Sequence, residues 1–254
     1  MTYVTFHDLK GASVFITGGG AGIGASLTDG FMAQGANVVF VQRSDASEFV
    51  QDMTKKHGRT PLFIRCDITD VAALQAAIKQ AAAANGPVTV LVNNAANDSR
   101  HTLADTSSDD WDNGMNVNLR PHFFTAQAVA EGMKAQGGSI INFSSISYMM
   151  GGAGYPGYVA AKAAITGLTR GLARELGPDN IRVNALMPGW VLTKRQLDLW
   201  ADKASLAAHL EKQCLKEHLV PQDVVDATLF LASKASRMMT GQALVVDGGV
   251  VVTG

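Results

Sequence analysis

The chain has 254 residues, of which 47% are hydrophobic and 17% charged, and its 21 Lys and Arg residues nearly balance 22 Asp and Glu residues. The length suits one large α/β domain, and a formal charge of −1 excludes the basic excess typical of nucleic-acid-binding proteins. No signal peptide is expected, and no apolar run approaches the ~18 residues of a membrane span. Cys66 and Cys214 form no CxxC pair. We therefore expect a cytoplasmic globular protein that binds neither membrane nor nucleic acid.

Short β-branched runs alternate along the chain with longer helical stretches. The expected buried strands span 13–17, 37–41, 62–66, 88–92, 139–143, 181–186 and 243–246. The expected helices span 22–35, 71–85 (with Thr69 as N-cap), 109–136 and 158–176. Strands joined by helical crossovers predict a single Rossmann-type α/β domain over residues 1–254. Its sheet would be parallel, doubly wound and seven-stranded, with helices on both faces.

A glycine-rich turn, Thr17-Gly18-Gly19-Gly20-Ala21-Gly22-Ile23-Gly24, follows the first expected strand and opens the first expected helix. The pyrophosphate of a dinucleotide must approach the backbone closely and meet the N–H groups of a helix N-terminus. Glycine permits this approach because it has no Cβ. At this position in the chain, the turn predicts a dinucleotide cofactor rather than a structural bend.

Tyr158 and Lys162 are spaced four residues apart on one expected helix, so their side chains share a face. A neighbouring ammonium favours the phenolate and would lower the pKa of the tyrosine toward neutrality. Taken alone, such a pair is more often an ordinary pair at a helix start. The rest of the sequence decides between the two interpretations.

Six motifs in order, covering almost the whole chain, resemble those of the short-chain dehydrogenase/reductase family. Ala96 departs from that pattern, because the family has glycine at this position. The motifs are the glycine turn, Asn93-Asn94-Ala95, Asn116-Val117-Asn118, Ser145 with Tyr158 and Lys162, Pro188-Gly189 with Thr193, and Asp247-Gly248-Gly249.

The resemblance implies a catalytic set. Tyr158 would be the general base that removes the substrate hydroxyl proton as hydride leaves for the nicotinamide. Lys162 would lower the pKa of Tyr158 and bind the nicotinamide ribose, Ser145 would hydrogen-bond the reacting oxygen, and Asn118 would hold a water of a proton relay. Ser144 competes with Ser145, and only the 13-residue spacing to Tyr158 favours Ser145. Tyr155 has no lysine four residues further on and is set aside.

The cofactor implied is NAD or NADP. The position that usually carries an acid for the adenosine ribose is Gln42, so the repulsion of a 2′-phosphate is missing and Arg43 could pair with it. Alternatively, Arg43 is an exposed loop residue lying over the adenine, and Gln42 bonds a ribose hydroxyl. Asp67 is expected at the adenine and Asn93 beside the adenosine ribose. The predicted cofactor residues are Gly18, Gly20, Gly22, Ile23, Gly24, Gln42, Arg43, Asp67, Ile68, Asn93, Ala95, Tyr158, Lys162, Pro188, Gly189, Val191 and Thr193.

The loops after the fourth, fifth and sixth strands are rich in polar side chains with aromatic residues among them, as a polyhydroxylated substrate requires. Three segments resemble those of the aldose 1-dehydrogenase branch of the family, which oxidises xylose, arabinose or galactose to the aldonolactone: Asn97-Asp98-x-Arg100-His101, Thr193-Lys194-Arg195-Gln196 and Gln213-Cys214-Leu215-Lys216. The alternative is that Asp98 and Arg100 only pin their loop. The segment at about 190–218 is expected to be a lid over the substrate. The predicted substrate residues are Asn97, Arg100, Ser145, Ser147, Tyr158, Trp190 and Arg195.

Two other functions remain open: a reductase of 3-oxoacyl thioesters in the same family, and a noncatalytic protein that senses dinucleotides. Family resemblance also implies a homotetramer joined through the helices of 109–136 and 158–176, where Ala163, Gly167 and Gly171 permit close approach. The histidines show no metal-ligand spacing, so no catalytic metal is expected.

Overall fold

The computed structural model describes residues 3–252, and within them seven parallel strands form one sheet in the order β3-β2-β1-β4-β5-β6-β7. The order reverses direction between β1 and β4, as in a doubly wound sheet, which confirms the predicted fold class. The strands are β1 (Ser13–Thr17), β2 (Asn37–Gln42), β3 (Leu62–Arg65), β4 (Val90–Asn93), β5 (Gly138–Phe143), β6 (Ile181–Pro188) and β7 (Ala243–Val246).

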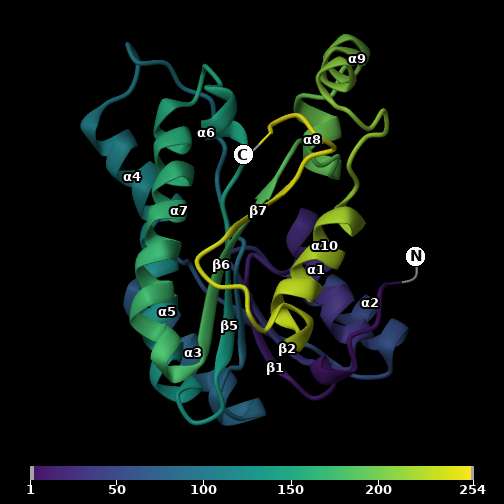
Figure 1. The fold of residues 1–254 in the computed structure, drawn as a ribbon, viewed down its shortest axis with the longest axis vertical. Coiled ribbons are helices and arrows are strands. Elements are labelled where there is room, and N and C mark those ends of the chain that lie inside the picture. Colours follow the sequence, from purple (N-terminus) through teal and green to yellow (C-terminus); the bar gives the residue numbers. More distant parts are fainter. Residues whose placement is uncertain (1–2, 253–254) are drawn as a thin grey trace.

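Helices cover both faces of the sheet, and Figure 1 shows one helical layer on each side of it. One layer holds α1 (Gly22–Ala33), α2 (Ser47–His57) and α10 (Pro221–Ala232). The other holds α3 (Val71–Asn85), α4 (Ser108–Asn118), α5 (Arg120–Met133) and α7 (Pro156–Leu176). Beyond the carboxyl ends of the strands lie α6 (Ser147–Met150), α8 (Lys194–Leu199) and α9 (Lys203–Lys212). Short 3₁₀ turns span His7–Leu9, Gly177–Asp179 and Lys234–Ser236.

The apolar strands supply two cores because successive side chains of a strand point to opposite faces. In β1, Val14 and Ile16 join the core beneath α1 and α10, whereas Phe15 joins the core beneath α3, α5 and α7. All five residues of β1 are buried. This burial on both faces explains why the strand is a nearly continuous apolar run rather than an alternating one.

The helix expected over 109–136 is wrong in one respect, because the structure has two helices there. α4 ends at Asn118, Leu119 leaves helical geometry (φ −127°, ψ −53°), and α5 begins at Arg120 with Pro121 in its first turn. Pro121 has no backbone N–H to donate to the carbonyl four residues earlier and its ring would clash with that carbonyl, so the helix breaks and restarts with the proline in its first turn. The break holds Asn118 at the end of α4, close to the loop that follows β4.

Three helix starts also differ from expectation or were not assigned. The N-cap of α3 is Asp70, whose carboxylate accepts the N–H of Ala73; Thr69 instead donates its own N–H and hydroxyl to Asp67. α7 begins at Pro156, two residues before Tyr158, because proline suits the first helical turn. The helix α2, amphipathic and without any buried residue, was not assigned from the sequence.

Candidate active site

In the glycine turn between β1 and α1, the glycines lie in close contact with other parts of the chain. A Cβ on Gly24 would lie 1.8 Å from the carbonyl oxygen of Gly18, and one on Gly20 would lie 2.5 Å from Oε1 of Gln42. The first helical turn of α1 has no side-chain cap at Ala21, so its N–H groups are available where the turn borders the cleft. Such a helix N-terminus binds anionic groups, and the turn therefore fits the pyrophosphate of a dinucleotide.

Asn94 fixes this turn from the end of β4. Its amide Nδ2 donates to the carbonyl oxygens of Thr17 at 3.1 Å and Gly18 at 3.2 Å. The backbone N–H groups of Asn94 and Ala95 both donate to Oγ1 of Thr17. These bonds tie the ends of β1 and β4, where the strand order reverses and open α/β sheets bind their ligands.

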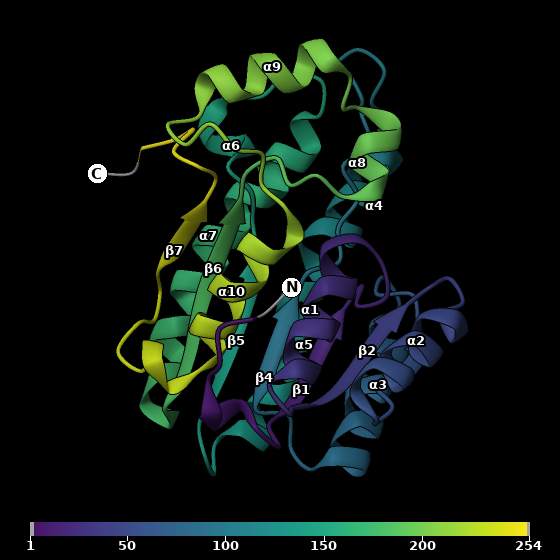
Figure 2. The ribbon, with the colours of Figure 1, turned by 90° about the vertical axis from the view of Figure 1, so that its right-hand side faces the viewer.

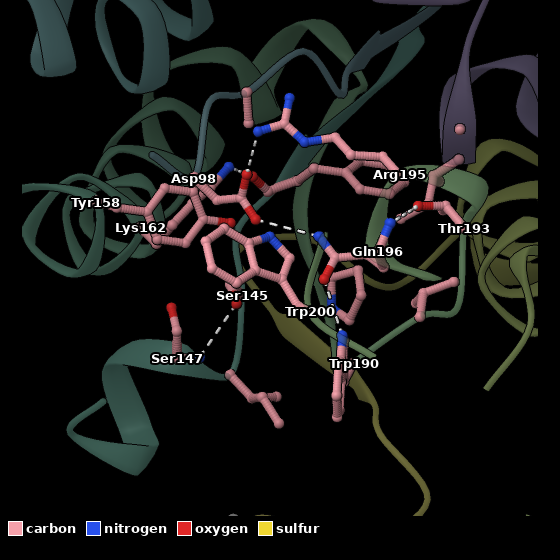
Figure 3. Close-up of a pocket in the computed structure, with 18 of the residues that line it drawn as sticks. Asp98, Ser145, Ser147, Tyr158, Lys162, Trp190, Thr193, Arg195, Gln196 and Trp200 are labelled. Atoms are coloured by element: carbon pink, nitrogen blue, oxygen red, sulfur yellow. Dashed lines mark hydrogen bonds and ion pairs between the residues drawn. The ribbon is translucent and has the colours of Figure 1, made fainter. Parts of the chain in front are cut away.

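The predicted catalytic side chains Ser145, Tyr158 and Lys162 meet beside the carboxyl end of β5 (Figure 3). Lys162 is 1% exposed, its Nζ lies 5.4 Å from the ring centroid of Tyr158, and it donates to the carbonyl of Phe143 at 2.8 Å. The carbonyl of Phe143 is the only hydrogen-bond partner of the Lys162 ammonium within residues 3–252. An ammonium has three donors, so the buried group still has donors for the hydroxyls of a ribose.

The two competing serines have different surroundings. Ser144 is 4% exposed and donates its hydroxyl to the carbonyl of Lys162 at 2.6 Å. The Oγ of Ser145 accepts the N–H of Ser147 at 3.1 Å, and the side chain lines the cleft, where it also hydrogen-bonds Tyr158. The geometry therefore favours Ser145 as the serine that meets a substrate oxygen.

Burial dominates the electrostatics of this cluster. It lowers the pKa of Lys162 to about 7, and it raises the pKa of Tyr158 above its usual range. The carboxylate of Asp98 raises the pKa of Tyr158 further, whereas Ser145 and Arg100 lower it. Lys162 is not among the groups that shift the pKa of Tyr158 here, so the expectation that it lowers this pKa stays a prediction.

A cleft of about 780 Å³ runs from the glycine turn past Tyr158 to the segment after β6. Its length suits a dinucleotide with a small substrate at the far end. Of the predicted residues, those lining it are Gly22, Ile23, Gly24, Arg100, Ser145, Ser147, Tyr158, Lys162, Pro188, Gly189, Trp190, Val191, Thr193 and Arg195. Those outside its lining are Gly18, Gly20, Gln42, Arg43, Asp67, Ile68, Asn93, Ala95, Asn97 and Asn118.

At the adenosine end, the side chains are already engaged with one another. Gln42 accepts the N–H of Gly20 at 3.0 Å through Oε1 and donates through Nε2 to Ser44. The guanidinium of Arg43 is 78% exposed and lies 3.8 Å from Asp67. Hydrogen bonds from Thr69 lower the pKa of Asp67. Gln42 thus supports the glycine turn, a contact that the sequence alone does not indicate.

Two predicted asparagines are buried and hydrogen-bonded within the protein. Asn93 has no exposed surface from which to contact a ribose: its amide donates to Asn142, and its oxygen accepts the hydroxyl of Thr125. Asn118, 3% exposed, pairs with the backbone of Asn97, accepting its N–H at 2.8 Å and donating to its carbonyl at 3.0 Å. Asn118 therefore holds the loop after β4 in place.

Polar and aromatic side chains form the substrate end of the cleft. Arg195 lies 2.9 Å from Asp98, Gln196 donates to the same carboxylate at 3.2 Å, and Trp190 donates to Gln196 at 2.8 Å (Figure 3). Asp98 thus pins its loop to α8, as the alternative interpretation of this residue held. Arg100 stacks over the ring of Tyr155 at 3.9 Å.

Several lining residues were missed in the sequence. Tyr155, set aside for lack of a lysine partner, lines the cleft together with Trp200 and His209. The guanidinium of Arg100 lies 5.1 Å from the ring of Trp200, and the ring of His209 packs edge-on against Trp190 at 5.3 Å. Trp200 and His209 fall in the expected lid at about 190–218, and aromatic residues there are the signal that could have found them.

Neither a metal site nor a membrane span emerges from residues 3–252. No three His, Cys, Asp or Glu side chains within this range are gathered so that they could hold a metal ion. The helices in the same range lack the length and apolar character needed to cross a bilayer.

Comparison with known proteins gives the family. Residues 18–251 match the family model described as enoyl-(acyl carrier protein) reductase. The chain is 48% identical over 248 residues to a probable galactose dehydrogenase of Rhizobium meliloti, covering 96% of this chain and 97% of that one. It is 45% identical over 251 residues to a D-xylose 1-dehydrogenase of Caulobacter vibrioides, covering 98% and 99%.

A solved structure supports the same family and fold. The blue fluorescent protein from a metagenomic library, in complex with NADPH, superposes with a TM-score of 0.87 at 34% identity, covering 96% of this chain and 99% of that one. The chain belongs to the short-chain dehydrogenase/reductase family. It is an NAD(P)-dependent oxidoreductase that acts on CH–OH groups, and the cleft described above fits that cofactor.

Proposed function

We propose that the protein oxidises a cyclic aldose of the galactose, arabinose or xylose type at its anomeric carbon, giving the aldonolactone and NAD(P)H. The observation that carries this proposal is the polar and aromatic substrate end of the cleft, beside Ser145 and Tyr158. A sugar offers hydroxyls to the polar side chains of such a wall and apolar ring faces to its aromatic side chains. The printed names of two relatives at 45–48% identity support the same substrate class.

The proposed mechanism assigns one task to each side chain. Ser145 donates its O–H to the anomeric oxygen, while its own oxygen is held by the N–H of Ser147. Tyr158 Oη takes the anomeric hydroxyl proton. Lys162 holds the nicotinamide ribose with the donors that Phe143 leaves unused. When bound, the oxidised nicotinamide supplies the hydride acceptor and a positive charge that favours the phenolate.

Initial rates with a panel of aldoses, polyols and secondary alcohols, measured with NAD⁺ and NADP⁺ in parallel, test this proposal. We expect turnover of a few aldoses, with kcat rising as pH increases because the pKa of Tyr158 is raised in the protein. The Tyr158→Phe variant should lose about 10²-fold or more of kcat. Absence of aldose turnover by an enzyme that binds cofactor would overturn the proposed substrate.

A second candidate is reduction of a 3-oxoacyl thioester, favoured by 35% identity over 244 residues to a protein named 3-oxoacyl-[acyl-carrier-protein] reductase in Chlamydia pneumoniae. It requires an acidic carrier protein as partner and strong preference for NADPH. Including a 3-oxoacyl thioester with NADPH and NADH in the panel separates the two candidates, since the sugar oxidation is expected with either cofactor.

We further propose a cytoplasmic homotetramer assembled through α4, α5 and α7. Trp111 on α4 and Phe123 on α5 are 44% and 43% exposed, and Gly167 and Gly171 on α7 have open space where a Cβ would lie. Large exposed aromatic rings beside small helical residues suit close helix packing between subunits. Both cysteines are free thiols, which suits a reducing compartment.

A further inference from the structure

The loop after β4 and the segment after β6 meet at one carboxylate. Asp98 is 24% exposed, and its two oxygens are bound by Arg195 at 2.9 Å and by Gln196 at 3.2 Å, both from α8. These residues are nearly one hundred positions apart in the sequence. Arg195 and Gln196 thus fasten the lid to the loop over the substrate end of the cleft. We call the Asp98–Arg195 ion pair the latch.

The same carboxylate faces the predicted base. Figure 3 shows Asp98 beside Tyr158 and Lys162 on one side and Gln196 on the other. The charge of Asp98 raises the pKa of Tyr158, second only to burial, and it also raises that of Lys162 against the larger effect of burial. The other polar groups that face the phenol are Arg100 from the loop, Ser145 after β5, Tyr155 just before α7 and Lys162 within α7.

Arg195 is the more exposed partner of the pair. Its side chain is 55% exposed and that of Asp98 is 24% exposed, so the cation reaches the carboxylate from a more accessible position. Loss of the Tyr158 proton places a second negative charge near Asp98. That charge is tolerated best when a cation already neutralises the first.

We propose that the latch makes proton removal by Tyr158 depend on the lid, with Arg195 neutralising Asp98 only while α8 is docked. This inference rests on the proposed role of Tyr158 as the base. Asp98 and Arg195 are positioning residues that act through Tyr158, so Arg195 is not assigned to the sugar. When the lid is lifted, the unpaired carboxylate of Asp98 disfavours the phenolate of Tyr158 by charge repulsion. When the lid is docked, Arg195 neutralises the carboxylate and this repulsion is removed.

The test is the pH dependence of kcat at saturating cofactor and sugar for Arg195→Gln, Asp98→Asn and the double variant. Arg195→Gln should shift the rising limb of the profile to higher pH by about one unit, a roughly tenfold loss of kcat on the acidic side. Asp98→Asn should shift the limb to lower pH. The double variant should match Asp98→Asn alone, because no carboxylate is left to uncover.

Lys194→Gln is the matched control. Lys194 is the neighbour of Arg195 on α8, carries the same charge, and pairs with Asp198 at 2.7 Å on an exposed surface. Its loss should leave the pH profile in place. A double variant that shifts as far as Arg195→Gln would overturn the proposal. So would an Arg195→Gln variant with an unchanged profile and only a raised KM for the sugar, which would return Arg195 to substrate binding.

A second readout separates this inference from the proposed substrate. Tyrosinate absorbance, titrated for each protein and for its Tyr158→Phe counterpart, gives the ionisation of Tyr158 as a difference without any turnover. The ionisation of Tyr158 should shift to higher pH in Arg195→Gln and to lower pH in Asp98→Asn and in the double variant. If no aldose is oxidised but these shifts are present, the proposed substrate fails and the latch stands; if aldoses are oxidised and the shifts are absent, the latch fails alone.

Discussion

Lys162 shows how far the interior alters one side chain. It is 1% exposed, and the one hydrogen-bond partner of its ammonium within the described part of the chain is the carbonyl of Phe143. Water no longer stabilises the ammonium, so its pKa falls to about 7. The folded protein therefore releases this proton near neutrality, whereas an exposed lysine in the unfolded chain keeps it to about pH 10.4.

This difference predicts a pH dependence of stability. Between pH 7 and 9 the unfolded chain binds one proton more than the folded chain, so the free energy of unfolding should rise with pH. The contribution of Lys162 is at most roughly 1.4 kcal/mol per pH unit. Chemical denaturation at several pH values, without cofactor, should show this rise, and Lys162→Met should remove it. Equal slopes in both proteins would mean that Lys162 remains charged in the fold.

At the scale of the elements, the sequence predicted the sheet better than the ends of the helices. Buried parallel strands can be recognised in the sequence as apolar runs. Every expected strand is present, and each begins within two residues of its expected start. Helix ends depend on single contacts instead. Pro121 was visible in the sequence and explains the break between α4 and α5, whereas the choice between Thr69 and Asp70 as N-cap depends on which side chain reaches the N–H of Ala73.

The N-cap of α3 gives a direct comparison of two neighbouring residues. Asp70→Ala removes the carboxylate that accepts the N–H of Ala73 and should lower the free energy of unfolding by about 1 kcal/mol. Thr69→Ala removes only the hydroxyl bond to Asp67 and should cost less. Denaturant midpoints of the two variants and the wild type measure this. A larger loss in Thr69→Ala would restore the N-cap expected from the sequence.

At the scale of the whole molecule, the candidate site was predictable where it rests on motifs, and not where it rests on distant contacts. The sequence spacing of Ser145, Tyr158 and Lys162 predicted that they lie at one site, and all three line the cleft. Spacing cannot show that Asp98 binds Arg195, because that contact depends on how the lid returns over the cleft. Nor can it show that Asn93 turns inward to Asn142, since that depends on packing between adjacent strands.

The lid at about 190–218 should become harder to cleave when the site is filled. α8 has no buried residue, α9 likewise has none, and the latch is exposed, so this segment is more open to proteases than the sheet. Cofactor and sugar together should slow cleavage within it, because its inner side then gains contacts. Mass spectrometry of limited digests locates the cuts. Equal rates with and without both ligands would contradict the lid.

The two ends of that segment are joined to each other. Val191 and Leu219 form a parallel bridge, and the N–H of Leu192 donates to the carbonyl of Leu219 at 2.9 Å. The residues between them therefore leave and re-enter the domain at one point, and a change in their number alters loop closure only slightly. Such an insert can be lengthened or exchanged in evolution while the sheet and the glycine turn stay as they are, so new substrates can be acquired without rebuilding the cofactor site.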